Sequence, residues 1–308
     1  MRHLLIDTDT ASDDAVALLM AMKYPNVRIE AITIVAGNVP AAQGLQNALY
    51  MTELCQYSTK TYLGAAKPLL RPLFTAQFVH GEDGMGDIGL DLQGRLPHQG
   101  NAIDVIIDTV NAFPDELEII TLGPLTNMAL ALSKAPEIAQ KVKSCTIMGG
   151  IGMGYGNITP VSEYNIWLDP EAAQIVFQSG MDMTMVGWDI SLKYAHFDTV
   201  ATEALRDTGK QMARFVVDIQ GAKSNFTEDT TGMAGFDLPD PIATAVALDR
   251  TVATEIKHLY AEVILGDGLT RGQTVIDHTN VLKKEPNMHV VLAASREKFL
   301  QMLHDSFE

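Results

Sequence analysis

The residues best suited to chemistry lie near the start of the chain, where four aspartates fall within eight residues. Asp7, Asp9, Asp13 and Asp14 follow the apolar run 4–6 and precede a helical pattern. Carboxylates this close repel one another strongly unless a cation lies between them. Oxygen-rich sites of this kind suit Ca²⁺ or Mg²⁺. Capping of the following helix would account for Asp13 and Asp14 but not for the other two. The cluster therefore predicts a divalent-cation site.

The elements that must position this cluster alternate between strand-like and helical patterns. Such alternation predicts an α/β fold with a mostly parallel central sheet flanked by helices, in which ligands bind beyond the carboxyl ends of the strands. No repeat or proline-rich linker divides the chain, so we expect one domain over 1–308. Two stretches, 69–99 and 224–239, are expected to be long loops. The expected strands are 4–6, 29–35, 117–122, 144–148, 183–186, 261–265 and 290–293, and the expected helices are 15–22, 41–54, 125–132, 170–177 and 296–304.

Composition narrows the class of protein. Of 308 residues, 47% are hydrophobic, which is enough to fill a large core and excludes a disordered chain. The net charge of −16 makes nucleic-acid polymers and membrane surfaces poor partners and favours a small neutral substrate or a cation. Two cysteines, no signal-peptide pattern and no apolar run of about 20 residues predict a cytoplasmic protein in a reducing compartment.

The acidic cluster has two competing interpretations. A phosphatase of the haloacid dehalogenase type begins with strand-Asp-x-Asp-x-Thr, and Asp7-Thr8-Asp9 fits, but Ala11 occupies the threonine position. That scheme also leaves the second acid pair without a role, and its downstream lysine would have to be Lys193. The alternative is the nucleoside hydrolase family of the inosine-uridine-preferring type. Its motif, Asp-Thr-Asp-x-x-x-Asp-Asp, resembles this sequence at every acid.

Further segments resemble the same family in the same order along the chain. Each one alone is typical of an ordinary turn, loop or helix start. Together they make coincidence implausible. They are Gly37-Asn38, the loop His80–Gly86, Gly123–Asn127, Met148-Gly149-Gly150, Asn157, the segment Glu163–Ala173 and Asp240-Pro241.

The resemblance implies an enzyme that hydrolyses the N-glycosidic bond of ribonucleosides to free base and ribose. It implies a Ca²⁺ held by Asp9, Asp14 through both oxygens, Asp240 and the main-chain carbonyl of Leu122. Asp13 would be the general base that activates water. It also implies a homo-oligomer, either a dimer or a tetramer. The positions implied to bind substrate are Asn38, His80, Met148, Asn157, Glu163, Tyr164 and Asn165.

One position departs from the family pattern. Many members carry a histidine just before the last metal-binding aspartate, proposed to protonate the leaving base, and this chain has Pro239 there. Aromatic stacking on the base or acids of the 224–239 stretch are alternatives, and a non-catalytic nucleoside- or ribose-binding protein is a third interpretation. The candidate residues are Trp188, Tyr164, Phe226 and Phe236 for stacking, and Asp237, Glu228 and Asp229 for closing over the base.

Overall fold

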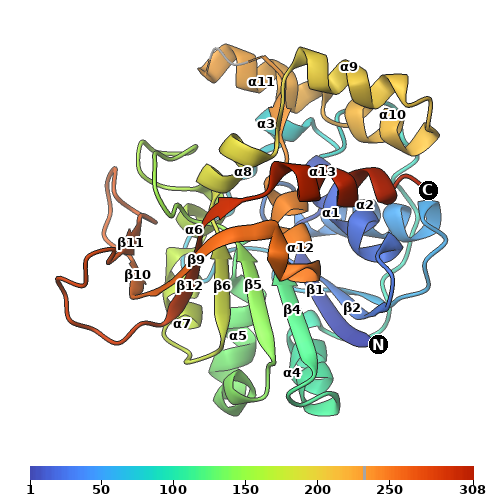
Figure 1. Ribbon diagram of the computed structural model, residues 1–308. Helices are drawn as coiled ribbons and strands as arrows, with labels where there is room; N and C mark the ends of the chain where they lie inside the picture. Colours follow the sequence, from blue (N-terminus) through green and yellow to red (C-terminus); the bar gives the residue numbers. More distant parts are fainter. Residues whose placement is uncertain (232–233) are drawn as a thin grey trace.

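An eight-stranded sheet forms the centre of the molecule (Figure 1). The computed structural model describes residues 1–231 and 234–308, and the side chains outside 229–233. Neighbouring strands are parallel, except that β9 runs antiparallel to β12 at one edge. This confirms the predicted α/β class. In sheet order the strands are β3 (Thr61–Leu63), β2 (Val27–Ile34), β1 (Arg2–Thr8), β4 (Leu117–Thr121), β5 (Ser144–Met148), β6 (Met183–Val186), β12 (Met288–Ala294) and β9 (Ala253–Leu259).

Helices cover both faces of the sheet because the strands are apolar on both sides. In β1, Leu4 and Ile6 point into one core and Leu5 into the other, following the two-residue period of a strand. The first core is covered by α1 (Ser12–Lys23), α2 (Ala41–Leu54), α12 (Pro239–Leu248) and α13 (Arg296–Asp305). The second is covered by α4 (Ala102–Ala112), α5 (Thr126–Lys134) and α7 (Pro170–Phe177).

The strand order places a topological switch between β1 and β4. The chain moves from β1 to β2 and β3 on one side, then returns to β4 on the other side of β1. Helices leave these two strands in opposite directions, which opens a crevice at their carboxyl ends. The acidic run after β1 and the residue after β4 meet there, and the Leu122 amide donates to the Asp7 carbonyl at 2.8 Å.

Shorter elements surround this crevice. Figure 1 shows α9 (Thr199–Asp207), α10 (Gln211–Asp218) and α11 (Gly221–Thr231) grouped at one end of the molecule, with α3 (Gln77–His80) beside them. The remaining elements are α6 (Tyr164–Leu168), α8 (Trp188–Tyr194), the pair β7 (His196–Phe197) with β8 (Phe236–Asp237), the pair β10 (Ala261–Val263) with β11 (Thr274–Ile276), and 3₁₀ turns at Pro136–Gln140 and Arg250–Val252.

Most of the expected elements lie where the patterns placed them. The helices 41–54 and 170–177 and the strands 144–148 and 183–186 have the predicted bounds. The expectation of a continuous loop over 224–239 is wrong, because α11 extends to Thr231 and β8 lies beyond it. The α11 sequence is polar and rich in threonine, so it carries no apolar stripe from which a helix could be predicted.

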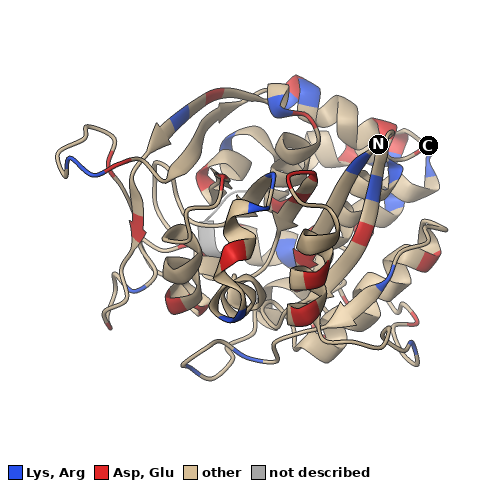
Figure 2. Ribbon diagram, turned by 90° about the horizontal axis from the view of Figure 1, so that it is seen from below, with Lys and Arg blue, Asp and Glu red and all other residues tan. Residues whose placement is uncertain are grey.

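Charged residues of both signs are spread over the elements in the view from below (Figure 2). Cys55 and Cys145 are not joined in a disulfide. Among the described helices, none has the length and apolar character needed to cross a bilayer.

Gly44 allows helix α2 to pass directly over the acidic turn, and this close approach gives a stability prediction. A Cβ at position 44 would lie 2.7 Å from the main-chain oxygen of Asp9. We expect Gly44→Ala to lower the free energy of unfolding by about 1–3 kcal/mol in urea, since backbone must move to admit the methyl group.

The matched control is Gly221→Ala in α11, where an added Cβ meets nothing within 4 Å. Because alanine favours a helix over glycine, this variant should be unchanged or more stable by up to about 1 kcal/mol. Equal stability of the Gly44 variant and the wild type would contradict the packing described here.

Candidate active site

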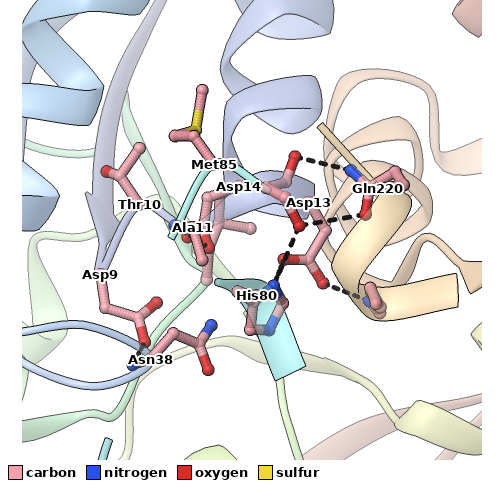
Figure 3. A network of polar contacts seen from close by, with 12 residues as sticks. Asp9, Thr10, Ala11, Asp13, Asp14, Asn38, His80, Met85 and Gln220 are labelled. Atoms are coloured by element: carbon pink, nitrogen blue, oxygen red, sulfur yellow. Dashed lines mark hydrogen bonds and ion pairs between the residues drawn. The ribbon is translucent and has the colours of Figure 1, made fainter. Parts of the chain in front are cut away.

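Buried carboxylates gather at the switch point of the sheet. Asp9 ends the segment after β1, Asp13 and Asp14 open α1, and Asp240 lies in the first turn of α12. All four are buried. Asp13, Asp14 and Asp240 each offer a carboxylate oxygen, and these three atoms lie within 4.8 Å of one another. Asp9 lies outside that group, beside Asn38 in Figure 3.

Burial and mutual repulsion make the ionised forms of these acids costly. Burial, followed by the charge of Asp13, raises the pKa of Asp14 to about 7. Burial and the charge of Asp14 raise the pKa of both Asp9 and Asp240 well above the ordinary range. A cation between the carboxylates would offset both effects.

The residues present fit a hard divalent cation. The Oδ1 atoms of Asp9 and Asp13 are buried and have no hydrogen-bond partner. Unpartnered buried carboxylate oxygens are rare and costly unless an ion or water satisfies them. The donor set is entirely oxygen, which suits Ca²⁺ or Mg²⁺ rather than a softer metal.

Asp9 is held in place by backbone that approaches it very closely. The Asn38 amide donates to its Oδ2 atom. A Cβ on Gly37 would lie 2.1 Å from Oδ2, and one on Gly123 would lie 2.8 Å from Oδ1. Only glycine leaves room for the carboxylate at these two positions, which accounts for the glycines in two of the segments noted in the sequence.

A tight turn holds Asp14. Its Oδ1 atom accepts from the Thr8 hydroxyl at 2.5 Å, and Oδ2 accepts from the Ala11 amide at 2.9 Å. Thr10, between them, has φ 25°, a conformation that β-branched residues rarely adopt. Strained backbone of this kind persists where surrounding contacts fix it, as at a functional site.

The remaining acid of the sequence cluster, Asp7, serves the scaffold. Its Oδ1 atom accepts from the Thr33 hydroxyl at 2.6 Å and from the Asn127 amide at 2.8 Å. Burial raises its pKa to about 7. Asn127 also donates to the Ile34 carbonyl and accepts from the Ala65 amide, so it ties β1 and β2 to the start of α5.

A cavity of about 480 Å³ opens beside the carboxylates. Its walls include every residue that the sequence implied to bind substrate, together with Asp13, Asp240 and Leu122. Asp9 and Asp14 lie behind this wall. The implied substrate residues in the wall are Asn38, His80, Met148, Asn157, Glu163, Tyr164 and Asn165.

Glu163 and Asn165 form a fixed polar corner of the cavity. The Glu163 carboxylate caps α6 and accepts from the amides of Asn165 at 2.8 Å and Gly150 at 2.9 Å. Burial raises its pKa to about 7. The Asn165 side chain donates to the Leu122 carbonyl at 2.8 Å, which leaves that oxygen a second lone pair. The Asn165 Oδ1 atom has no partner.

His80 is buried in the cavity wall rather than exposed on a loop. Its Nδ1 atom lies 2.9 Å from the Ser12 hydroxyl and 3.8 Å from Asp13 Oδ1. Gln220 donates to the Ser12 carbonyl and accepts from its hydroxyl (Figure 3). Since the Ser12 proton points to Gln220, the histidine must donate from Nδ1. Burial lowers the pKa of His80 to about 4, so the ring is neutral at pH 7.

The structure adds a residue that sequence reasoning missed. Lys223 extends from α11 into the cavity, where its ammonium lies 2.7 Å from Asp13 Oδ2 and 3.6 Å from Asp237 Oδ1. Burial alone would lower the pKa of Lys223, but the charges of these two acids outweigh it and raise the pKa. Asp237 is itself fixed by the Trp188 indole at 2.9 Å and the Ser191 hydroxyl at 2.7 Å. No motif marks this lysine, whose partner lies 210 positions away.

Three of the four aromatic candidates line the cavity, and the fourth lies in the hydrophobic core. Trp188, Tyr164 and Phe226 line the cavity. Phe236 does not: it is 1% exposed and stacks on Phe197, with ring centroids 5.5 Å apart, so it is excluded from the candidates for stacking on the base. Asp237 lines the cavity and Glu228 does not, and the Asp229 side chain lies outside the described residues.

The structure does not place the lysine that the phosphatase interpretation requires at the site. Lys193 is exposed and lies over the Tyr194 ring, 5.1 Å from its centroid, outside the cavity wall.

Comparison with known proteins gives a consistent result. Residues 4–301 match the family model described as inosine-uridine preferring nucleoside hydrolase. The pyrimidine-specific ribonucleoside hydrolase RihA of Salmonella paratyphi C (strain RKS4594) is 34% identical, covering 99% of this chain and 98% of the relative.

Solved structures of nucleoside hydrolases have the same fold as this chain. A plant nucleoside hydrolase, PpNRh1, has a TM-score of 0.92 at 30% identity, covering 99% of this chain and 98% of that one. A purine-preferring ribonucleoside hydrolase from Gardnerella vaginalis has a TM-score of 0.90 at 32% identity, with the same coverage.

The raised acid pKa values predict an unusual pH dependence of stability in the metal-free protein. Asp14 has a pKa of about 7 when folded, against about 3.9 when unfolded. The stability this group contributes is complete below pH 4 and is lost as the pH rises through 7. Without metal, we expect the free energy of unfolding to fall by on the order of 3 kcal/mol between pH 4 and pH 8.

Addition of Ca²⁺ at pH 8 should restore stability, by about 2.7 kcal/mol at a hundredfold excess over its Kd. Asp14→Asn should reduce the pH dependence, of which the raised pKa values of Asp9 and Asp240 leave a part, and should abolish the response to Ca²⁺. Asp108→Asn, on the exposed face of α4, should behave as the wild type. Thermal melts with EDTA or Ca²⁺ measure each quantity, and a wild-type protein indifferent to both pH and Ca²⁺ would disprove a cation site here.

Proposed function

The chain belongs to the inosine-uridine preferring nucleoside hydrolase family, and from this premise we propose that it is a Ca²⁺-dependent enzyme that hydrolyses ribonucleosides to free base and ribose. The observation that carries the proposal is the pair of unpartnered carboxylate oxygens on Asp9 and Asp13, buried beside a cavity with both polar and apolar lining. A nucleoside has a sugar diol for the cation and a base for the apolar wall.

The metal would be held by Asp9, Asp14, Asp240 and the Leu122 carbonyl. When bound, Ca²⁺ supplies positive charge that makes an adjacent water more acidic and attracts the ribose hydroxyls. The Thr8, Ala11 and Asn38 contacts support this assignment because they hold the acids in one geometry before an ion binds.

Asp13 would remove the proton from the attacking water. Its Oδ2 atom is fixed by Lys223, and its Oδ1 atom has no partner, so one oxygen is held while the other can accept. Burial would raise the pKa of Asp13, but the charge of Lys223, a smaller contribution from His80 and the hydrogen bond from Lys223 together outweigh it and lower the pKa, which keeps the carboxylate ionised. A general base in this state contributes typically about 10²–10⁴-fold to the rate.

The ribose would bind at the polar corner. Asn38, Asn157 and Asn165 offer amide groups to its hydroxyls, and Met148 lines the same wall. Glu163 supplies negative charge near the sugar carbon, which becomes positive as the glycosidic bond breaks. Because backbone amides hold this carboxylate in place, it needs little reorganisation during the reaction.

Relatives differ in the base named for them, since one is pyrimidine-specific and another purine-preferring. The test is therefore a panel of inosine, adenosine, guanosine, uridine and cytidine, with release of reducing sugar as the readout. We expect hydrolysis of at least one nucleoside, loss of activity in EDTA, and recovery on addition of Ca²⁺. Binding by calorimetry without any hydrolysis would favour the nucleoside-binding interpretation instead.

We also propose that the enzyme acts in the cytoplasm as a dimer or tetramer, as the family resemblance implies. Light scattering on the purified protein measures the assembly, and a monomer at micromolar concentration would disprove that part of the proposal.

Asp13→Asn tests the assignment of the general base. The amide keeps the shape of the side chain but cannot take a proton, so we expect kcat to fall by about 10²–10⁴-fold. The melting temperature should fall, because buried Lys223 loses a charged partner, but the Ca²⁺-induced shift should be retained. Asp108→Asn is the matched control and should retain full activity. A kcat within tenfold of the wild type would show that another group serves as the base.

A further inference from the structure

The cavity lining is of two chemical kinds, and the reacting bond must lie where they meet. Its carboxylates and amides suit the ribose. Its apolar and aromatic side chains suit the base, and Phe78 and Phe226 among them are in ring contact, with centroids 5.5 Å apart. The other apolar side chains are Ile158, Trp188 and Leu192. The glycosidic bond joins ribose to base, so it spans the boundary between these two kinds of lining.

Lys223 lies at this boundary. Lys223, Phe226 and Thr227 are spaced at i, i+3 and i+4 on α11, so they share the face of the helix that lines the cavity. The ammonium contacts Asp13 on the ribose side, and Phe226 one turn later belongs to the apolar lining. A charged group at this point is within reach of the nitrogen that leaves the sugar.

Hydrolysis places a negative charge on that nitrogen, and few groups in the wall can stabilise it. Pro239 has no donor. The Trp188 indole is used by Asp237, and the Tyr164 hydroxyl lies 2.6 Å from the Phe74 carbonyl. The neutral ring of His80 has its proton on Nδ1, directed at Ser12. Within the described cavity wall, Lys223 is the single lysine or arginine.

We propose that Lys223 is a catalytic residue that stabilises the departing nucleobase with its positive charge and a hydrogen bond, in the place where this chain has no histidine. The inference rests on the proposed function. The C1′–N bond breaks and its electron pair stays on the base. The oxygen of the water bonds to C1′, and Asp13 takes the proton of that water. The base anion, held by the ammonium, then takes up a proton from solvent. Asp13 releases the proton that it took from the water to solvent, which restores the starting state.

The position of Lys223 couples these events. Before reaction, its charge is balanced by Asp13 and Asp237. As Asp13 becomes neutral, the ammonium loses one partner at the moment when negative charge appears on the base. Asp237 keeps the ammonium at the boundary, because the indole of Trp188 and the hydroxyl of Ser191 fix its carboxylate. The stabilisation therefore grows along the reaction, as transition-state stabilisation requires.

The test compares two leaving groups in Ca²⁺-saturated full-length enzyme. Nucleosides need help with departure, whereas 4-nitrophenyl β-D-ribofuranoside releases a phenolate that is stable without it. We expect Lys223→Met to lower kcat/KM for both substrates, because Asp13 loses the contact that fixes it and keeps it ionised. The loss for the best nucleoside should be about 10²–10³-fold and should exceed the loss for the nitrophenyl riboside by at least about tenfold. Lys223→Arg, which restores charge and donors, should recover most nucleoside activity. Lys193→Met is the matched exposed control and should match the wild type for both substrates.

Three results would overturn the inference. Equal losses for both substrates would mean that Lys223 acts only through Asp13. A nucleoside loss below threefold would mean that it has no role in departure. Failure of Lys223→Arg to recover activity, with an intact Ca²⁺-induced melting shift, would exclude a charge effect. If the methionine variant does not fold, Lys223→Gln takes its place with the same expectations. A wild-type enzyme inactive on both substrates would instead refute the proposed function.

Discussion

Repulsion among buried carboxylates is the constraint on which the rest of this structure depends. Asp9, Asp13, Asp14 and Asp240 are collected in a volume where like charges are costly, and the pKa values of three of them rise as a result. Such an arrangement persists only if other contacts hold it. The Thr8 hydroxyl at the end of β1, the Ala11 amide of the same turn and the Asn38 amide after β2 provide those contacts, at the cost of strained backbone at Thr10.

The topology of the sheet explains why this arrangement is possible. With β1 between β2 and β4, residues from three remote parts of the chain reach one edge without long connections. The helix α12, which packs against α1 over the same core, then brings Asp240 to these acids. Glycines at 37, 44 and 123 let neighbouring backbone approach the acidic turn. The geometry of this turn and the packing of α2 against it therefore depend on the same close contacts.

Sequence patterns predicted much of this and failed where contacts are remote and unmarked. Asn38, Asn157 and Glu163 could be placed together because the segments that carry them resemble those of the family in the same order along the chain. Lys223 could not, because its helix lacks an apolar stripe and its partners are far along the chain. Phe236 remained among the stacking candidates for a similar reason: in a segment expected to be a loop, nothing in the sequence distinguishes a core ring from a cavity ring.

Helix α11 is fastened to the centre of the molecule by side chains that also belong to the site. Gln220, just before it, binds Ser12, and Lys223 binds Asp13. The same helix contributes Phe226 to the cavity wall. A lineage that reshapes the cavity through α11 therefore also acts on the contacts of Ser12 and Asp13. In this scaffold the shape of the cavity and the setting of its acids change together.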